Sequence, residues 1–415
     1  MNALELWIEG EHVGLLEVDA GIWQLHYADS WCSAGESFPL SPNLPLQLEP
    51  LIDADDRRTV RWFFDNLLPE GAIREALAAH ARLSEADSFG LLSRYGRESA
   101  GAITLVPPGD LVDGGSYHAL ASSELRRLIA DLPRVPFIAA GGRARMSLAG
   151  AQHKLALHRL DETWLIPQGD AASSLIVKPD NARAELFPFC PANEHFCVSL
   201  ARRVGLVAPL CELVHLPEPL FVIHRYDRES GPSGVRRLHQ IDLCQLLDLS
   251  PGAKYEGDGG PGIEEVYRAL EATRQPAASR LQWLRLLIFN YAIGNSDAHA
   301  KNIAFLVDRA GVHLAPAYDL LSVAVYGAEF DYMAMLLEGE VRYGWVEPDH
   351  WQQLAVHLGI PNVYLRRLRH SLARAIDAAA SELLAGPMYT AQERRFLSDV
   401  VALIQRHVSY LLRDE

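Results

Sequence analysis

The first 28 residues of the chain alternate between apolar and polar side chains. Residues 4–8, 12–15 and 23–27 follow a two-residue period, and Glu9-Gly10 supplies a turn after the first run. A period of two is that of a β-strand with one buried face. The pattern therefore predicts a small β-meander at the start of the chain.

From residue 57 the apolar period becomes helical, and a second helix is predicted over residues 72–83. Pro69-Glu70-Gly71 separates the two helices, because proline and glycine favour turns. Further turn residues at 107–110 mark a boundary. We therefore predict an N-terminal unit over residues 1–110.

The middle of the chain, residues 111–239, is predicted as a second unit that is rich in strands. Its expected helices lie near residues 122–132 and 193–204, and its expected strands at 146–157, 163–167, 174–178, 211–216 and 220–226. The segments at 146–157 and 163–167 have the pattern of a hairpin. The strand at 174–178 has the composition of a buried strand, and it ends in Lys178.

Residues 240–415 are predicted as a third, mainly helical unit. An apolar stripe at Leu284, Leu287, Ile288 and Tyr291 runs directly into a polar loop at residues 295–302. The other expected elements are a hairpin at 303–307 and 312–314 and long helices over 362–384 and 391–412.

Composition and charge exclude several classes of protein. The 415 residues are 49% apolar and 22% charged, as in ordinary globular proteins, and the net charge of −15 argues against nucleic-acid binding through the overall field. The five cysteines form no C-x-x-C pair, which fits a reducing, cytoplasmic setting. The N-terminus has no signal-peptide pattern, and no apolar run is long enough for a membrane span.

The polar loop after the apolar helix has the spacing of a kinase catalytic loop. Four residues separate Asp297 from Asn302, and Asp319 follows 17 positions after Asn302. A protein kinase uses one Asp to accept the proton of the attacking hydroxyl, and an Asn and a later Asp to hold magnesium. The alternative is a polar turn after a helix, because Asn, Ser and Asp favour turns.

Two upstream features could bind phosphate. Lys178, at the end of its strand, could contact the α- or β-phosphate of ATP, or it could be an ordinary surface lysine. The segment Ser147–Lys154 could present backbone N–H groups to phosphates, although it matches neither a Walker A loop nor the kinase glycine-rich loop. A hairpin turn is the simpler interpretation of that segment.

The remaining polar groups in this region have weaker patterns. His299 with Asp297 makes an incomplete metal shell, so we expect it to support the loop or contact nucleotide. Asp242 and the acidic cluster of Glu256, Asp258, Glu264 and Glu265 are expected to be solvated loop charges.

The order of these elements is that of a two-lobed kinase. The predicted fold class is α+β, with a β-rich N-terminal lobe that includes an extra N-terminal subdomain, and an all-helical C-terminal lobe. Nucleotide would bind between the lobes.

Taken together, the ordered motifs resemble the HipA-type serine/threonine kinases, the toxin half of bacterial type II toxin–antitoxin pairs. The resemblance runs nearly end to end. The segments that carry it are Trp7–Gly10, Pro39–Ser41, Phe63–Pro69, Ser147–Lys154, Ile176–Lys178, Asn193-Glu194, Arg225–Asp227, Gln240–Gln245, Lys254–Gly262, Gly294–Asn302 and Tyr318-Asp319.

The resemblance implies a role for each matching residue. Asp297 would be the catalytic proton acceptor, Asn302 and Asp319 would hold Mg²⁺, and Ser147 would be the autophosphorylation site whose phosphate switches the kinase off. The implied ATP-binding residues are Ala149, Gly150, Ala151, Gln152, His153, Lys154, Lys178, His224, Arg225, Tyr226, His299, Asn302, Tyr318 and Asp319.

Two segments depart from the family pattern. Relatives have an acidic residue where His224 stands in the hinge, so the contact to adenine is expected to run through the backbone. The segment 180–192, where the family's substrate-facing loop lies, is short, and the resemblance therefore does not carry over the identity of the substrate.

Three functions follow as hypotheses. The first is an ATP- and Mg²⁺-dependent kinase that phosphorylates a component of translation, such as an aminoacyl-tRNA synthetase. The second is a co-repressor that binds a helix-turn-helix, HipB-like antitoxin and reaches DNA only through it, with Arg366, Arg367 and Arg369 either near DNA phosphates or on a solvated helix face. The third is a small-molecule kinase, which would have no need of the N-terminal unit.

Overall fold

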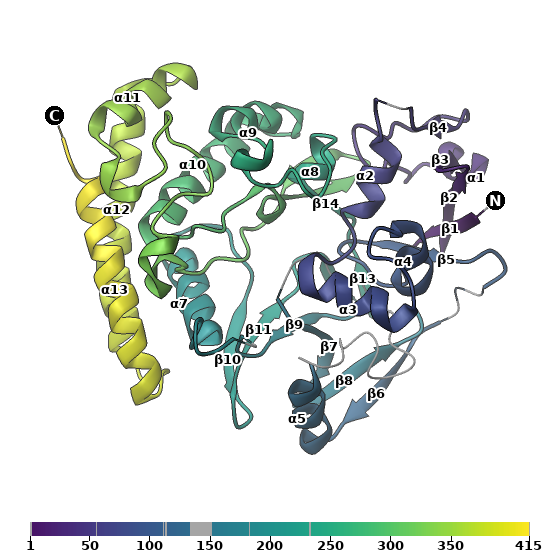
Figure 1. Ribbon diagram of the computed structural model, residues 1–415, viewed down its shortest axis with the longest axis horizontal. Coiled ribbons are helices and arrows are strands. Elements are labelled where there is room, and N and C mark those ends of the chain that lie inside the picture. Colours follow the sequence, from purple (N-terminus) through teal and green to yellow (C-terminus); the bar gives the residue numbers. More distant parts are fainter. Residues whose placement is uncertain are drawn as a thin grey trace. The chain divides into compact units, whose positions relative to one another are not determined.

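The computed structural model describes residues 2–54, 56–110, 112, 114–132, 152–181, 183–231 and 234–414. The chain divides into two compact units. Unit 1 comprises Met1–Ala182, Val222–Pro251 and Phe305–Val312, and unit 2 comprises Arg183–Phe221, Gly252–Ala304 and His313–Glu415. Figure 1 shows the elements of both units along the chain.

Unit 1 begins with the predicted meander, extended to a five-stranded antiparallel sheet. The strands are β1 (Asn2–Ile8), β2 (Glu11–Asp19), β3 (Ile22–Tyr27), β4 (Leu51–Ile52) and β5 (Ile103–Val106), in the order β4-β3-β2-β1-β5. Leu4, Leu16 and Leu25 are paired across the three central strands and are fully buried. Gly14 is required in β2, because a Cβ atom there would lie 2.1 Å from the His26 carbonyl oxygen.

Short helices follow the meander in the sequence. They are α1 (Asp29–Ser33), α2 (Thr59–Asp65), α3 (Gly71–Ala81) and α4 (Ser88–Tyr95). Phe63 and Phe64 of α2 are buried, and Phe89 of α4 lies 5.8 Å, centroid to centroid, from Trp23 of β3. The apolar face that the sequence predicted on α2 thus belongs to the core of unit 1.

The second sheet of unit 1 carries the predicted strand that ends in Lys178. Its strands are β6 (Ser116–Leu120), β7 (Leu155–Leu160), β8 (Thr163–Gln168), β9 (Leu175–Lys178) and the end of β11 (Pro219–His224), in the order β11-β9-β7-β8-β6. Helix α5 (Ser122–Asp131) follows β6. The predicted hairpin at 146–167 is present as β7 and β8, although residues 146–151 lie outside the described residues.

Two smaller sheets contain the remaining strands of unit 1. One is the hairpin of β12 (Arg228–Gly231) and β13 (Gly234–Arg237); the other has the order β14-β15-β16. The strands of the latter are β14 (Gln240–Asp242), β15 (Ala304–Asp308) and β16 (Gly311–Leu314), and helix α8 (Leu243–Leu246) follows β14. The sequence predicted the β15–β16 hairpin but not the β12–β13 hairpin.

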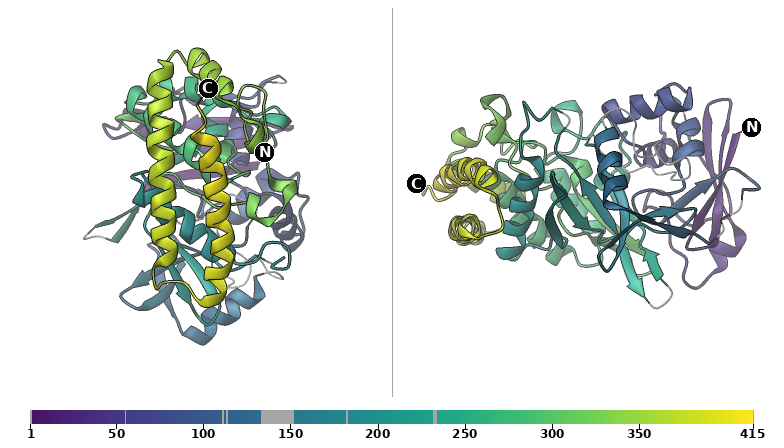
Figure 2. Two further views of the ribbon diagram at one scale, coloured as in Figure 1. Left: turned by 90° about the vertical axis from the view of Figure 1, so that its left-hand side faces the viewer. Right: turned by 90° about the horizontal axis from the view of Figure 1, so that it is seen from below.

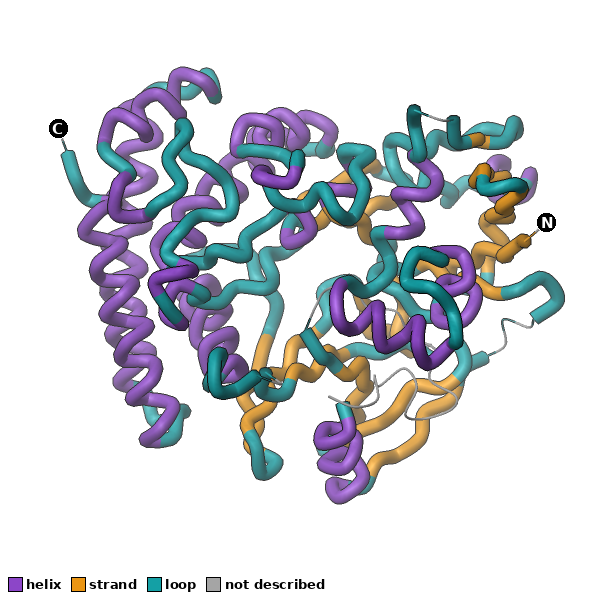
Figure 3. Tube along the Cα trace, viewed as in Figure 1, coloured by secondary structure: helices purple, strands orange, loops and turns teal. Residues whose placement is uncertain are grey.

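Unit 2 is mainly helical, as the purple tube in Figure 3 shows. Its helices are α7 (Cys190–Arg203), α9 (Ile263–Ala269), α10 (Pro276–Ile293), α11 (Pro348–His357), α12 (Asn362–Ala385) and α13 (Ala391–Leu411), and it also contains β10 (Cys211–His215), which pairs with β11. Helices α12 and α13 run side by side for most of their length and both contact α7 and α10 (Figure 2). Helix α10 is consequently buried on several sides.

Helix α10 ends in a motif that positions the polar loop. Gly294 has φ +67° and donates its N–H to the Tyr291 carbonyl at 3.2 Å, while Asn295 donates to the Asn290 carbonyl at 3.0 Å. This pair of bonds is a Schellman motif, which favours glycine because its residue has positive φ. A Cβ at Gly294 would also lie 2.9 Å from the Ala324 side chain. The direction in which the chain leaves α10 is therefore fixed.

The stability of both units should depend on pH through buried histidines. Burial lowers the pKa of His195, in unit 2, and of His239, in unit 1, to about 4. Between about pH 6.5 and 4 these two histidines are protonated in the unfolded chain but remain neutral in the folded chain. The free energy of unfolding therefore falls as pH falls. At pH 4 the expected loss is about 3 kcal/mol for each ring.

Urea unfolding at pH 7, 5.5 and 4.5 would measure this loss. In the variant His239→Gln, the side-chain N–H can still donate to the Leu40 carbonyl, as the His239 Nε2 atom does at 2.8 Å, but it does not titrate. The pH dependence of unfolding of unit 1 should flatten in this variant and stay unchanged in His80→Gln, because His80 is exposed on α3. An equal slope in both variants would contradict the assignment.

Candidate active site

The predicted catalytic loop of unit 2 is closed on itself by hydrogen bonds to the main-chain carbonyl of Asp297. The Asn302 side-chain Nδ2 donates to the Asp297 carbonyl oxygen at 2.6 Å, and the His299 N–H donates to the same oxygen at 2.8 Å. The Asp297 carboxylate lies outside this ring of bonds, and its side chain is 44% exposed. The structure therefore joins Asp297 to Asn302 while leaving the carboxylate accessible.

Asn295 connects this loop to the segment that carries Asp319. Its Nδ2 atom donates to the Asp319 carbonyl oxygen at 3.2 Å, and its Oδ1 atom accepts from the Asp297 N–H at 3.2 Å. Asn295 is only 2% exposed, so these bonds are shielded from water. The sequence did not single out Asn295, although a buried amide two residues before Asp297 explains how two distant segments are held together.

Asp319 is fixed from both sides. The Tyr318 hydroxyl donates to the Lys301 carbonyl, and the N–H groups of Val323 and Ala324 donate to the Gly294 carbonyl at 3.0 and 2.9 Å. The backbone of Asp319 itself has φ +56°, a conformation that is uncommon for residues other than glycine and that clusters at functional sites. The predicted residues Asp297, Asn302, Tyr318 and Asp319 are thus parts of one hydrogen-bonded assembly.

His299 supports this assembly. Its side chain is 8% exposed, its Nε2 atom lies 3.8 Å from Asp297 Oδ1, and its ring meets the Tyr255 ring edge-on at 4.9 Å between centroids. The Tyr255 hydroxyl donates to Asp297 Oδ1. The sequence alone gives Tyr255 no role, because nothing in the spacing connects residues 255 and 297.

The acidic cluster before α9 is only partly solvated. Glu256 Oε2 accepts a hydrogen bond from the Leu336 N–H at 2.6 Å, and burial raises the pKa of Glu256. The prediction that Glu256 is a solvated loop charge is therefore wrong, whereas Asp258 and Glu265 are exposed as expected. Glu264 forms part of a surface group with Glu338 and His357, in which His357 Nδ1 lies 2.8 Å from Glu338.

An apolar hollow lies beside the predicted catalytic loop within unit 2. Its wall is formed by Ala298, His299 and Asn302 of the loop, by α10 and by residues 333–337. Asp297 and Asp319 are not among the residues that line it. The hollow therefore adjoins the loop without containing its two carboxylates.

Unit 1 contains the predicted phosphate-binding residues. Lys178 is the last residue of β9 and is 5% exposed, so it is not an ordinary surface lysine. Gln152, His153 and Lys154 directly precede β7, and burial lowers the pKa of His153. Ser147, Ala149, Gly150 and Ala151 lie outside the described residues.

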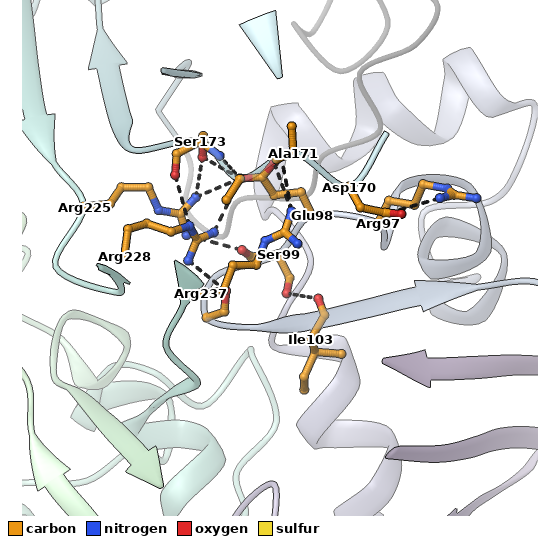
Figure 4. A network of polar contacts seen from close by, with 12 residues as sticks. Arg97, Glu98, Ser99, Ile103, Asp170, Ala171, Ser173, Arg225, Arg228 and Arg237 are labelled. Atoms are coloured by element: carbon orange, nitrogen blue, oxygen red, sulfur yellow. Dashed lines mark hydrogen bonds and ion pairs between the residues drawn. The ribbon is translucent and has the colours of Figure 1, made fainter. Parts of the chain in front are cut away.

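The predicted hinge, residues 224–226, begins at His224, the last residue of β11. The Arg225 N–H donates to the Ser174 carbonyl at 2.9 Å, which connects the hinge to the start of β9. The Arg225 guanidinium points away from the backbone into a buried network (Figure 4), and burial raises the pKa of Tyr226. The side chain and the main-chain N–H of Arg225 are therefore both engaged inside unit 1.

That network joins distant parts of unit 1. Glu98 lies 3.2 Å from Arg225, 3.4 Å from Arg228 and 3.9 Å from Arg237. Asp227 pairs with Arg225 at 2.5 Å and with Arg228 at 2.9 Å, and it accepts from the Gly101 N–H at 2.9 Å. Figure 4 shows the arginines converging on Glu98 and Ser173.

The electrostatics of the network favour its charged form. Burial alone would raise the pKa of Glu98, but Arg237, Arg228 and Arg225 hold it below its usual range. The pKa of Asp227 is likewise lowered by Arg225 and Arg228 against the effect of burial. The pKa of Arg228 falls to about 10, chiefly because of burial. At neutral pH the network is thus a set of paired, buried charges.

The predicted hinge, the buried lysine at a strand end, the D-x₄-N loop and the later aspartate correspond to the parts that a protein kinase needs. Comparisons with known proteins identify the family. The family model of the HipA-like C-terminal domain matches residues 146–382, and that of the HipA N-terminal domain matches residues 4–106. The chain belongs to the HipA family.

Individual relatives agree with this assignment. The chain is 34% identical to the putative kinase Y4mE of Sinorhizobium fredii, over 92% of each chain. It is 28% identical to the serine/threonine-protein kinase toxin HipA of Shewanella oneidensis, over 98% of this chain and 96% of the relative.

A solved structure matches over the same length. The HipA chain in the complex of Shewanella oneidensis HipA, HipB and operator DNA has a TM-score of 0.85 and 27% identity, and the match covers 99% of this chain and 100% of that one. The predicted family, the α+β two-lobed kinase-like fold and the prediction of a kinase are thereby confirmed. None of the helices in the described ranges is both long and apolar enough to cross a membrane.

Proposed function

We propose that this kinase transfers the γ-phosphate of ATP to serine or threonine in a Mg²⁺-dependent reaction, and that it is the toxin of a type II toxin–antitoxin pair. The observation that carries the catalytic part is the closed assembly of Asp297, Asn302 and Asp319 in unit 2. Asp297 would accept the proton of the attacking hydroxyl, since its carboxylate is the accessible group of the loop.

The donor set of the assembly fits magnesium. The Asn302 Nδ2 atom is used by the Asp297 carbonyl, which leaves the Asn302 Oδ1 atom for a cation. That oxygen and the Asp319 carboxylate are hard oxygen ligands of the kind that Mg²⁺ prefers. When bound there, Mg²⁺ would neutralise phosphate charge, while Asn302 and Asp319 would keep it in place. In unit 1, Lys178 would bind a phosphate and the hinge backbone would bind adenine.

The metal role gives the first test. With labelled ATP, the wild-type chain should incorporate phosphate in Mg²⁺ and lose incorporation in EDTA. Asp319→Asn removes a charged ligand and should lower the rate at least 100-fold, by the size of effect that removing one transition-state charge stabiliser has in other enzymes. Asp308→Asn, in the exposed β15–β16 turn, is the matched control. Equal labelling by the two variants would overturn the metal assignment.

The site of labelling tests autophosphorylation. Ser147→Ala should remove the label from the chain if Ser147 is the acceptor. A label that persists at another residue would reject only the assignment of Ser147 as the acceptor.

The target in other proteins is proposed to be a component of translation, such as an aminoacyl-tRNA synthetase. Phosphoproteomics after induction would identify it, and the cytoplasm is the compartment in which such a target and an operator-bound antitoxin occur.

A second role, binding to a HipB-like helix-turn-helix antitoxin, is favoured by the solved HipA–HipB–DNA complex. Contact with DNA would run through the antitoxin. Arg366 and Arg367 are exposed on α12, but Arg369 is 3% exposed and lies over the Trp351 ring at 5.4 Å. The suggestion that Arg369 reaches DNA is therefore wrong. A gel shift of operator and antitoxin should change when this chain is added; no change would reject the co-repressor role.

A further inference from the structure

Of three consecutive residues of unit 2, two contact the proposed catalytic loop and the third contacts Leu336. The Lys254 carbonyl accepts from the Ala300 N–H at 3.0 Å, and the Tyr255 hydroxyl donates to Asp297 Oδ1. Glu256 Oε2 accepts from the Leu336 N–H at 2.6 Å. Residues 254–256 therefore connect the catalytic loop to the segment that follows Asp319.

The loop that carries these residues is rigid by construction. The N–H groups of Asp258 and Gly260 both donate to the Tyr255 carbonyl, at 3.0 and 2.8 Å. A Cβ atom at Gly260 would lie 2.6 Å from the Ala253 carbonyl oxygen and 2.7 Å from that of Tyr255. The main chain of Tyr255 is thus held by a turn that only glycine permits at position 260.

The ring of Tyr255 is also held. It meets the His299 ring at an interplanar angle of 87°, with 4.9 Å between centroids, and the Lys254 Nζ atom lies 5.2 Å from its centroid. The cation over its face and the imidazole at its edge leave the hydroxyl directed at Asp297. The ring contacts do not involve the hydroxyl, so they would persist in phenylalanine.

We propose that Tyr255 is a positioning residue for Asp297, an inference that rests on the proposed role of Asp297 as proton acceptor. A carboxylate has two oxygens, each able to accept more than one hydrogen bond. The bond from Tyr255 fixes one of them and hence the torsion of the carboxylate, while the 44% exposure of the Asp297 side chain leaves it reachable for the acceptor hydroxyl. Fixing the acceptor atom before the substrate arrives raises the rate without contacting ATP.

The test is Tyr255→Phe in the full chain, with autophosphorylation from labelled ATP as the reaction. We expect the maximal rate to fall about 10- to 100-fold, the range typical of a misplaced catalytic group, while the ATP concentration for half-maximal rate changes less than twofold. Tyr364→Phe, at an exposed tyrosine of α12, is the matched control and should match the wild type in both parameters. An unchanged rate in Tyr255→Phe would overturn the proposal. A faster rate would also overturn it, because the hydroxyl would then block the site.

A second measurement keeps the test independent of folding. Replacing Tyr255 with difluorotyrosine retains the ring but makes the phenol more acidic, so the hydroxyl loses its proton at a lower pH. The rate of this variant should fall at alkaline pH where the wild-type rate does not, because a phenolate cannot donate to Asp297 and repels it. Identical alkaline profiles would contradict the proposal. If Asp297→Asn retains activity, the proposed function fails; if Asp297→Asn is inactive and both Tyr255 variants are normal, only this inference fails.

Discussion

Replacing Asp297 with asparagine is expected to lower the rate of phosphotransfer by about two to four orders of magnitude, the contribution of a positioned general base. Asparagine has the same shape but cannot accept the proton of the acceptor hydroxyl. The main-chain oxygen at position 297 would still accept from Asn302 and His299, so the loop should keep its geometry. ATP affinity should therefore change little, and the loss should lie in the maximal rate. Labelled ATP and Mg²⁺, with rates taken over a range of ATP concentrations, would measure both.

The control for this variant is Asp258→Asn, which removes one carboxylate of the same unit from an exposed position. It should retain the wild-type rate. A weaker affinity for ATP in Asp297→Asn, with an unchanged maximal rate, would show that Asp297 binds nucleotide and is not the proton acceptor.

Much of the architecture around the site follows from local sequence patterns. The period of the apolar residues predicted α12 and α13 to within a residue or two, and it predicted the second half of α10. Gly294 marks the end of α10 because its positive φ is needed there. Lys178 was placed at a strand end by the apolar run before it, and β9 ends at that residue. These features depend on neighbours in the sequence, which is why a single sequence reveals them.

The features that were not predicted from the sequence depend on contacts between residues that are far apart in the chain. Tyr255 and Asp297 are 42 positions apart, and Asn295 and Asp319 are 24 apart, so no local period connects them. Strand β5 pairs with β1 across about 100 residues, and its four residues, Ile-Thr-Leu-Val, are too few to establish an alternation that would have identified it. The charges of Glu98 and Glu256 were expected in solvent or were overlooked, because the charge of a residue does not reveal which partners bury it.

Replacing Glu98 with glutamine should destabilise unit 1 by about 3–5 kcal/mol, the usual result of removing one partner from a buried ionic group. Glutamine preserves the volume. It leaves Asp227 as the acidic partner of Arg225 and Arg228, and it removes the acidic partner that lies 3.9 Å from Arg237. Guanidinium groups stay protonated at neutral pH, so the buried arginines would keep charges that have lost one acidic partner. Urea unfolding at pH 7 would measure the loss.

The matched control is Glu229→Gln, which breaks an exposed ion pair with Arg236 in the β12–β13 hairpin and should cost less than about 1 kcal/mol of stability.

The pH dependence of unfolding supplies a second readout. Because the folded pKa values of Glu98 and Asp227 are lowered, their stabilisation is present above the usual carboxyl range, near pH 4, and is lost as pH falls through the lowered values. Glu98→Gln should remove part of that acid sensitivity, whereas Glu229→Gln should not. Since Arg225 also holds the hinge backbone at Ser174, a higher ATP concentration for half-maximal rate is expected in Glu98→Gln. Equal stability of the two variants would mean that the network contributes no more than a surface ion pair.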